Sequence, residues 1–347
     1  MTDRNTQIAI GIAIVFVILM AFVVMGQHGG EEKERAVVIY TSVDQVYSEP
    51  VFEAFEKESG IKVLPVYDVE ATKTTGLVNR LIAEKARPQA DVFWSGEFSQ
   101  TIVLKNESVL APYQSPSAAD IPAQFRDPEG YWTGFGGRAR IFIVNTDLLT
   151  PSRYPDSVYD LLDDQYTPSS AGIALPMFGT TATHAAALYS HLGNVKAHEL
   201  FSSISRRGVR VVDGNSVVRD KVVDGELAFG LTDTDDACGP VESGKNVTIV
   251  IPDQGDGQMG TLVIPNTVAL VAGGPHPEEG TVFMDYLLDR QREADMVASG
   301  WIQIPVRDIP ASRCINTTGI RTIPVSYHDT YFALSPAQKD LAEIFIR

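Results

Sequence analysis

The first third of the chain alternates between short apolar runs rich in β-branched residues and longer segments with apolar residues at helical spacing. Residues 37–41, 61–66 and 90–94 have the composition of buried strands, whereas residues 46–58 and 74–85 have the spacing of helices that bury one face. Strands that alternate with helices predict an α/β fold with a mostly parallel sheet. Ligands of such sheets bind beyond the carboxyl ends of the strands, so the loops there are the first place to search for a site.

The same alternation continues through the rest of the chain. No internal repeat with a fixed period is visible, so a solenoid or a propeller is not expected. Further strands are predicted at residues 138–145, 173–175, 209–212, 227–231 and 262–271, and further helices at residues 180–192, 216–223 and 278–298.

An uncharged apolar run precedes this α/β part, at residues 8–25. A helix of this length nearly spans the roughly 30 Å hydrocarbon layer of a bilayer, which predicts a transmembrane anchor. A cleaved signal peptide is the alternative, although its apolar region is usually only about 7–15 residues long. Arg4 before the run and Glu31 after it favour an N-terminus inside the cell. The chain after the run is then expected to be extracytoplasmic or periplasmic. Residues 1–35 are therefore expected to be an anchor or signal segment with a charged spacer.

The composition excludes several classes of protein. The net charge of −16 argues against a nucleic-acid partner, because a phosphate-binding face needs an excess of Lys and Arg. The two cysteines, Cys238 and Cys314, are too few for a disulfide framework or a structural zinc site. Outside the cytoplasm they can form one disulfide, and the sequence leaves this pairing open. No nucleophile elbow, zinc-protease motif or phosphate-binding Walker loop is present, so no enzyme class is indicated.

Five segments, in this order and spacing, carry a family resemblance. They are VIYTS at 38–42, PQADVFW at 88–94, GRAR at 137–140, DGNSV at 213–217 and GELAFGLTD at 225–233. The chain resembles the extracellular solute-binding proteins (family 1) of ABC importers, within the branch that contains ferric-ion, phosphonate, hexose-phosphate and thiamine binders. The resemblance covers nearly all of the chain after the apolar run.

The resemblance implies a two-lobed, periplasmic-binding-protein-like fold of class II with mixed, mostly parallel sheets. Two α/β lobes are then joined by crossing strands, for which residues 141–144 and 262–270 are the candidates. The first lobe is expected at residues 36–141 and 265–347, the latter including a C-terminal tail, and the second lobe at residues 142–264. Such a receptor works as a monomer, closes on a small ligand between its lobes, and delivers it to a membrane permease. It needs no cofactor, and ferric iron enters only as a transported ligand.

An oxyanion site is predicted at the start of the helix at residues 180–192. A helix start presents free N–H groups and the positive end of the helix dipole, and here Gly179, Thr180 and Thr181 add flexible backbone and hydroxyl donors. Plain capping of the helix by a threonine is the alternative explanation. In ferric binders the turn that matches these residues holds the small anion that accompanies the metal.

The resemblance extends this anion site to other parts of the chain. An asparagine of the ferric binders matches Asn215, and an arginine near their anion matches Arg138 or Arg140. Ser42, at the carboxyl end of the first strand, is grouped with them as a ligand-binding candidate.

The tyrosine ligands of ferric binders are not preserved at the matching positions. Thr234 and Asp235 stand where the tyrosine pair is expected, Asp44 where a histidine is often found, and Thr75 near an acidic ligand. Direct binding of iron is therefore in doubt.

An acidic cluster stands at the matching place instead. Asp233, Asp235 and Asp236 follow a buried strand, on the cleft side of a parallel sheet. Carboxylates suit a hard metal ion, a ligand ammonium group or sugar hydroxyls, so these residues and Asp44 are candidate metal ligands. A turn that caps the next helix is the structural alternative.

Three functions remain open at this point. The leading one is a tethered receptor for an oxyanion-bearing ligand, either ferric iron with an anion or a phosphonate or organophosphate. The second is a hydrolase that uses the cluster of Asp233, Asp235 and Asp236 as a metal site for phosphoester cleavage. The third is a sensor that feeds a signalling partner.

Overall fold

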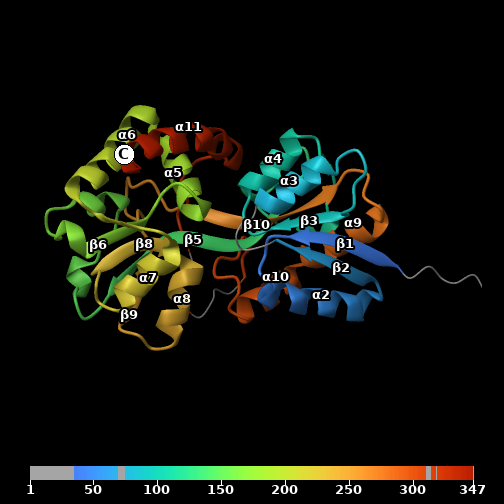
Figure 1. Ribbon diagram of the computed structural model, residues 1–347. Coiled ribbons are helices and arrows are strands. Elements are labelled where there is room, and N and C mark those ends of the chain that lie inside the picture. Colours follow the sequence, from blue (N-terminus) through green and yellow to red (C-terminus); the bar gives the residue numbers. More distant parts are fainter. Residues whose placement is uncertain (1–34, 69–74, 310–313, 318, 347) are drawn as a thin grey trace, which may run out of the picture.

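The computed structural model describes residues 35–68, 75–309, 314–317 and 319–346. Two α/β lobes lie side by side and are joined in the middle by two long strands, β5 (Thr133–Asn145) and β10 (Val263–Val271) (Figure 1). Both strands are completely or almost completely buried, since apolar residues line both of their faces. The predicted two-lobed α/β architecture is confirmed.

The first lobe is built around the start of the chain. Its strands are ordered β2-β1-β3-β10, with β1 parallel to both of its neighbours and the short β4 paired with β10. These strands are β1 (Ala36–Thr41), β2 (Lys62–Tyr67), β3 (Val92–Ser95) and β4 (Leu110–Ala111), and the helices of this lobe are α2 (Gln45–Ser59), α3 (Thr75–Ala83), α4 (Ser99–Asn106), α9 (Pro277–Leu287) and α10 (Arg290–Ala298).

The second lobe continues the sheet in the order β5-β8-β6-β7, and β9 pairs with β5. Its strands are β6 (Ala171–Ala174), β7 (Arg210–Val212), β8 (Phe229–Asp233) and β9 (Val247–Val250), and its helices are α5 (Gly179–Leu192), α6 (Asn194–Arg207), α7 (Asn215–Val223), α8 (Thr234–Glu242) and α11 (Tyr327–Phe345). Short 3-10 helices lie at η2 (Pro116–Ala118), η3 (Ala123–Phe125), η4 (Pro151–Arg153), η5 (Val158–Leu162) and η6 (Pro168–Ser170).

The sheet is mixed, as expected, but it is not mostly parallel, which corrects that part of the expectation. The pairs of β1 with β2 and β3, and of β6 with β7 and β8, are parallel, whereas every described pair that involves β5 or β10 is antiparallel. The reason is that β5 and β10 run between the lobes in opposite directions. β5 pairs with β10 up to Ala139 and with β8 from Arg140 onward, so the crossing lies just before residues 141–144.

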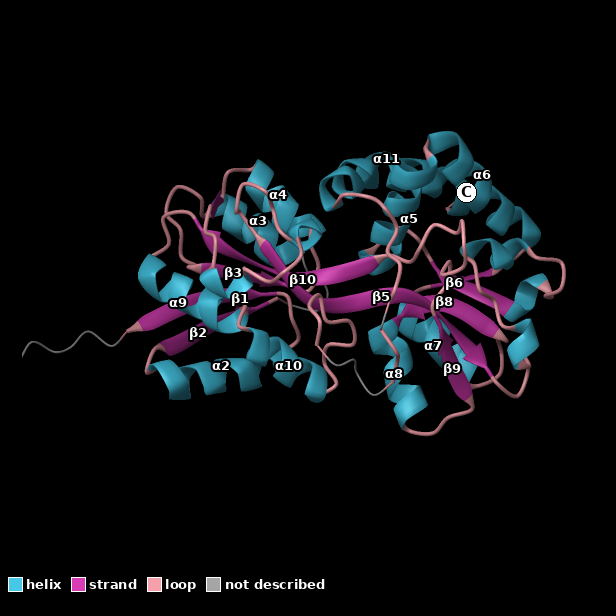
Figure 2. Ribbon diagram, turned by 180° about the vertical axis from the view of Figure 1, so that it is seen from behind, coloured by secondary structure: helices cyan, strands magenta, loops and turns pink. Residues whose placement is uncertain are grey.

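Successive residues of β5 face two different cores, as expected for a strand with helices on both sides. Phe142 and Val144 pack in the cluster that contains Leu188 of α5, while Ile141 and Ile143 pack in the cluster that contains Ala237 of α8. Figure 2 shows α5 and α11 on one side of this sheet and α7 and α8 on the other.

One predicted helix differs from the structure and another is confirmed. The segment 278–298 forms α9 and α10 instead of one helix, because the chain turns at Leu288 and the Asp289 side chain accepts a hydrogen bond from the N–H of Gln291, which starts a new helix. The helix expected at residues 180–192 is α5, and Gly193 at φ 79° separates it from α6.

The C-terminal helix α11 lies against the second lobe, although residues 265–347 were grouped with the first. Asp340 of α11 contacts the Tyr189 hydroxyl of α5 and lies 2.8 Å from Nδ1 of His198 on α6. Gln338 donates a 2.8 Å hydrogen bond to the carbonyl of Met177, just before α5. The end of the chain, near α6 in Figure 1, therefore belongs to the packing of the second lobe.

Two further expectations concern the cysteines and the apolar run near the start of the chain. Cys238 of α8 and Cys314 form a disulfide, with Cα atoms 5.3 Å apart, which resolves the pairing that the sequence left open. The predicted anchor at residues 8–25 lies outside the described residues. Within the described part of the chain, no helix combines the length and the apolar character needed to cross a membrane.

Candidate functional site

Three helices of the second lobe begin at the same edge of the sheet. The parallel strands β6, β7 and β8 lead into α5, α7 and α8, so the starts of these helices lie beyond the carboxyl ends of the strands. The N-cap residues Phe178, Gly214 and Asp233 make no side-chain cap hydrogen bond. The first N–H groups of α5 and α7, with their positive dipole ends, are therefore available to an anion.

A buried polar cluster fills the space between these helix starts. Nη1 of Arg140 donates to Oδ1 of Asp233 at 2.8 Å and to Oδ1 of Asn215 at 3.1 Å. The other carboxylate oxygen of Asp233 accepts from Nδ2 of Asn215 at 2.9 Å and from the Thr180 hydroxyl. The Thr181 hydroxyl donates to Oδ1 of Asn215 at 3.0 Å. The carboxylate of Asp233 thus accepts the hydrogen bonds that an external oxyanion would accept.

The guanidinium of Arg140 retains unused donors. The residue is fully buried, and its Nε and Nη2 atoms have no hydrogen-bond partner. His184, one turn into α5, is also buried, and burial together with the nearby Arg140 lowers its pKa well below the usual value. The imidazole is consequently neutral and adds no charge to the cluster.

A second, more exposed ion pair lies beside the cluster. Nη1 of Arg138 lies 3.0 Å from Oδ2 of Asp235, with 24% of the Arg138 and 37% of the Asp235 side chain exposed. Burial opposes the charge of Arg138, but the carboxylates of Asp235, Asp233 and Asp236 raise its pKa. Burial also raises the pKa of Asp235. Nη2 of Arg138 lies 3.5 Å from the carbonyl oxygen of Gly96, so this arginine connects the two lobes.

Asp236 completes the acidic group. Burial, followed by the charges of Asp235 and Asp233, raises the pKa of Asp236 to about 7. Its carboxylate lies 3.6 Å from Nη1 of Arg219 and accepts a 3.2 Å hydrogen bond from the Thr232 hydroxyl. One carboxylate oxygen from each of the three aspartates lies within 4.8 Å of the others, the one such group of potential metal ligands in the described part of the chain.

None of the described hydrogen bonds joins the predicted residues of the first lobe, Ser42 and Asp44, to this cluster. The Ser42 hydroxyl lies 3.4 Å from that of Ser95 and accepts a 3.1 Å hydrogen bond from the N–H of Gly96. Asp44 is exposed at the start of α2. Gly179 opens α5 with φ 55°, a conformation that glycine adopts most easily. The structure thus brings five predicted residues into one cluster, namely Arg140, Thr180, Thr181, Asn215 and Asp233.

Sequence reasoning missed two residues next to the site. Oδ1 of Asn266 on β10 is buried without a partner, while its Nδ2 donates to the carbonyl of Gly136 at 2.8 Å. A Cβ atom at Gly96 would lie 4.0 Å from this oxygen, which places Asn266 beside Arg138. Its signal was a polar residue inside the apolar run 262–271. Arg219 carried no signal, since a charged residue on a helix is normally solvent-exposed.

The tyrosine hydroxyls form their described hydrogen bonds with groups other than Asp233, Asp235 and Asp236. None of the described hydrogen bonds joins a tyrosine hydroxyl to Asp233, Asp235 or Asp236. The partners are found elsewhere instead, with Tyr40 bonded to Glu84, Tyr113 to Asp285, Tyr189 to Asp340 and Tyr327 to the carbonyl of Val263.

Comparison with known proteins agrees with this architecture. The sequence model of the bacterial extracellular solute-binding proteins matches residues 87–314, more than half of the chain. A candidate 2-aminoethylphosphonate-binding periplasmic protein of Salmonella typhimurium is 27% identical over 291 residues, which cover 79% of this chain and 80% of the relative. An Fe(3+)-binding periplasmic protein of Serratia marcescens is 23% identical over 262 residues, 74% of this chain and 75% of the relative.

Solved structures share the fold. The ferric binding protein from Campylobacter jejuni has a TM-score of 0.78 at 21% identity and covers 89% of this chain and 99% of its own. The periplasmic binding protein AfuA from Actinobacillus pleuropneumoniae, solved with fructose-6-phosphate, has a TM-score of 0.71 at 21% identity and covers 91% of this chain and 98% of its own. The predicted family resemblance is confirmed: the chain belongs to the bacterial extracellular solute-binding proteins, the receptors that bind a solute and deliver it to an ABC importer.

Proposed function

We propose that this receptor binds a ligand with an oxyanion at one end and an ammonium or hydroxyl groups at the other. The observation that carries the proposal is the position of Arg140. Its buried guanidinium, with Nε and Nη2 unpartnered, lies at the starts of α5 and α7, beside the acidic group at the start of α8. Donors for an anion and acceptors for a cation are thus neighbours.

Several hydrogen-bond donors are available to the anionic end of the ligand. The first N–H groups of α5 and α7, the Thr180 and Thr181 hydroxyls, Asn215 and the two arginines all supply hydrogen bonds to phosphonate or phosphate oxygens. In the structure, Asp233 accepts part of these bonds. An entering anion must replace Asp233 or use the remaining donors, and both routes favour a dianionic ligand that attracts Arg140 more strongly than one carboxylate does.

The other end of the ligand faces Asp235 and Asp236. Asp235 is partly exposed and forms an ion pair with Arg138, and Asp236, with a pKa of about 7, changes its charge near neutral pH. An ammonium group placed here would gain charge-assisted hydrogen bonds and would draw the proton from Asp236. A relative named for 2-aminoethylphosphonate and a solved structure of the same fold with exogenous fructose-6-phosphate bound support a ligand of this two-ended chemistry.

The decisive experiment measures which ligand class binds. Mass spectrometry of gently denatured protein from the native host, with metal analysis of the same sample, identifies the bound solute. Calorimetry then compares 2-aminoethylphosphonate, fructose-6-phosphate and methylphosphonate. Opposite the oxyanion, the first carries an amine, the second carries hydroxyl groups and the third carries neither. We expect methylphosphonate to bind weakest, and equal binding of all three would reject a role for the acidic group.

Ferric iron with an anion is the second candidate, because related proteins bind iron and the three aspartates lie within 4.8 Å of one another. Tyrosine-bound ferric iron has a strong visible absorption band, and carboxylate-bound iron does not. A titration with ferric citrate should therefore leave the protein nearly colourless. A strong band in the visible range would favour iron bound through tyrosines that lie elsewhere in the hydrogen-bond network.

The receptor is proposed to act without chemistry on its ligand and to be held at the membrane by the apolar run 8–25. A hydrolase that used the aspartates with a metal ion would convert its substrate, so phosphorus NMR of a bound organophosphate distinguishes the two. An unchanged spectrum after prolonged incubation supports the receptor. Partition of the full chain into membranes, compared with a variant that lacks residues 1–35, tests the anchor, and the molecular mass of that variant in solution tests the monomeric state.

A further inference from the structure

A large cavity lies in the first lobe next to the crossing strands, away from the candidate ligand site. Its volume is about 740 Å³, and its walls come from α4, from the loop between β4 and β5, from the start of β10 and from the segment before α11. It shares no residue with the cluster around Arg140 or with the Arg138–Asp235 pair. A cavity of this size is within the range of small-molecule sites, roughly 300–1,000 Å³.

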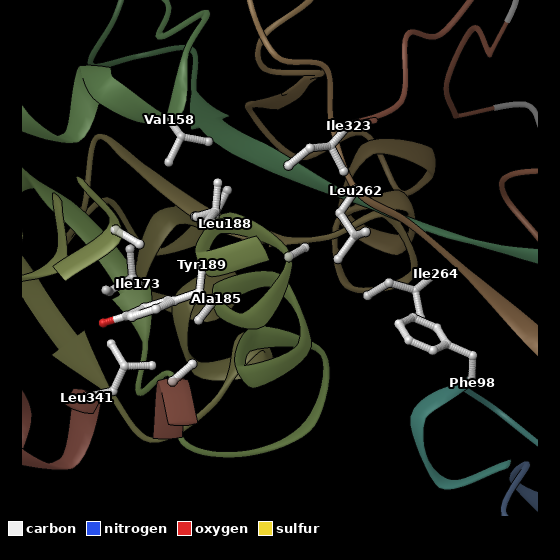
Figure 3. Packing of buried hydrophobic residues seen from close by; sticks show 14 of the residues in the cluster. Phe98, Val158, Ile173, Ala185, Leu188, Tyr189, Leu262, Ile264, Ile323 and Leu341 are labelled. Atoms are coloured by element: carbon white, nitrogen blue, oxygen red, sulfur yellow. The ribbon is translucent and has the colours of Figure 1, made fainter. Parts of the chain in front are cut away.

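One part of the cavity wall is apolar and aromatic. Trp132 and Tyr327 lie with ring centroids 6.2 Å apart, and Phe98 packs behind Tyr327 at 4.3 Å. Leu262 and Ile323 belong to the same buried cluster, and Figure 3 shows both on the side of the cluster toward Ile264 and Phe98. These side chains offer flat apolar surface, which suits an aromatic ring system.

The charged groups of the cavity are almost all engaged with one another. The ammonium of Lys105 lies 2.7 Å from Asp127 and 2.6 Å from Glu129. Asp127 also accepts hydrogen bonds from the N–H groups of Glu129 and Tyr131. Nδ1 of His328 lies 3.7 Å from Oδ1 of Asp329. These groups therefore have little charge left for a ligand.

Arg126 is the exception. Its Nε atom is buried and has no hydrogen-bond partner, and within the described part of the chain its guanidinium forms no ion pair with an acidic side chain. A buried donor without a partner costs stability. Arg126 also lines the cavity, so an anion bound there can pair with its guanidinium. The planar guanidinium matches a carboxylate, which accepts two parallel hydrogen bonds.

We propose that this cavity is a second binding site, which takes a ring-bearing carboxylate. The carboxylate pairs with Arg126, and the ring packs against Trp132 and Tyr327. The proposal goes beyond the solute function, because the two sites are lined by different residues and select ligands of different chemistry. The ligand cleft selects polar zwitterions or sugar phosphates, whereas this cavity selects an apolar body with one negative charge.

Calorimetry on the full-length chain tests the proposal, with naphthalene-2-carboxylate as the probe. We expect saturable binding of one equivalent. The neutral isostere naphthalene-2-carboxamide should bind at least tenfold more weakly, because it cannot form the ion pair. The Arg126→Gln variant should weaken binding of the carboxylate at least tenfold, and should leave binding of the carboxamide unchanged.

Three further variants make the result decisive. Arg87→Gln is the matched control, because Arg87 is an exposed arginine outside the cavity, and it should bind the probe as the unaltered protein does. Thr181→Val should also bind normally, since a loss there would locate the probe in the ligand cleft. Ala123→Trp adds bulk at the exposed rim of the cavity and should block binding even if Arg126→Gln fails to fold. Absence of saturable binding, or undiminished affinity in Arg126→Gln or in Ala123→Trp, overturns the proposal.

Discussion

Two arginines on the same strand form ion pairs of opposite character. Arg138 and Arg140 are two residues apart on β5, so both side chains are on one face of the sheet. Arg140 is fully buried, and its partner Asp233 is held by three hydrogen-bond donors. Arg138 and its partner Asp235 are partly exposed. Burial therefore makes the Arg140–Asp233 pair the harder one to separate, whereas we propose that the partly exposed Arg138–Asp235 pair exchanges partners with a ligand.

The largest expected effect is the loss of the buried carboxylate. Asp233→Ala would leave the Arg140 guanidinium charged and without a counterion, and breaking a buried ion pair in this way typically costs about 3–5 kcal/mol of the free energy of unfolding. Urea denaturation measures the change. Asp235→Asn is the control and should lose less than about 1 kcal/mol, because its pair is exposed to water. Equal losses in the two variants would contradict the comparison.

The second effect is a dependence of stability on pH. The pKa of Asp236 is raised to about 7 in the folded protein, so the native state binds a proton more tightly than the unfolded chain does. Stability from this residue is complete below the unfolded pKa and decreases as the pH rises through about 7. At about 1.4 kcal/mol per pKa unit, and with an allowance for solvent screening, the decrease between acid and neutral pH should reach about 2–4 kcal/mol.

Two variants check that this dependence belongs to Asp236. Asp236→Asn should flatten the pH profile of the free energy of unfolding, because the amide does not titrate. Asp220→Asn is the matched control, since the Asp220 carboxylate contacts the same Arg219 but is 61% exposed. A profile that stays steep in Asp236→Asn would assign the dependence to another residue, with Asp235 the first to examine.

The fold was predictable where the local pattern is strong. The apolar runs that form β1, β3, β5 and β10 appear directly in the sequence, since their residues face two cores and few are polar. Helix α11 was missed because Pro336 lies inside it, and an internal proline normally ends a helix. The helix persists because Ala337 and Leu341 are buried. Only tertiary packing decides such a case.

The residues of the site were predictable, but their partners were not. Helix starts and strand ends identify Thr180, Asn215 and Asp233 as neighbours, because parallel strands end at one edge of the sheet. The pairing of Arg140 with Asp233 spans 93 residues of sequence. No local pattern indicates that the carboxylate accepts the hydrogen bonds expected for the ligand. Arg219 was missed for the same reason, whereas Asn266 had a local signal as a polar residue inside the apolar run 262–271.

The third prediction concerns the ligand. Asp235→Asn should weaken binding of 2-aminoethylphosphonate by about 1.5–3 kcal/mol, the typical value for a hydrogen bond to a charged group. Thr181→Val should also weaken binding, through the anionic end. Calorimetry with methylphosphonate separates the two ends, because Asp235→Asn should leave its affinity unchanged while Thr181→Val lowers it. Undiminished affinity for 2-aminoethylphosphonate in both variants would reject this site.

The smallest expected effect is the energy of the exposed pair itself. A double-mutant cycle with Arg138→Gln and Asp235→Asn should give a coupling free energy of about 0.2–1 kcal/mol in the ligand-free protein, as for other ion pairs in contact with water. The reason is that each side chain recovers hydration when its partner is removed. Urea denaturation of the two single variants and the double variant measures this coupling. A weak coupling would mean that a ligand can separate Arg138 from Asp235 at little cost and bind one end to each. A coupling as large as that expected for Arg140 and Asp233 would make both pairs structural and would exclude this exchange.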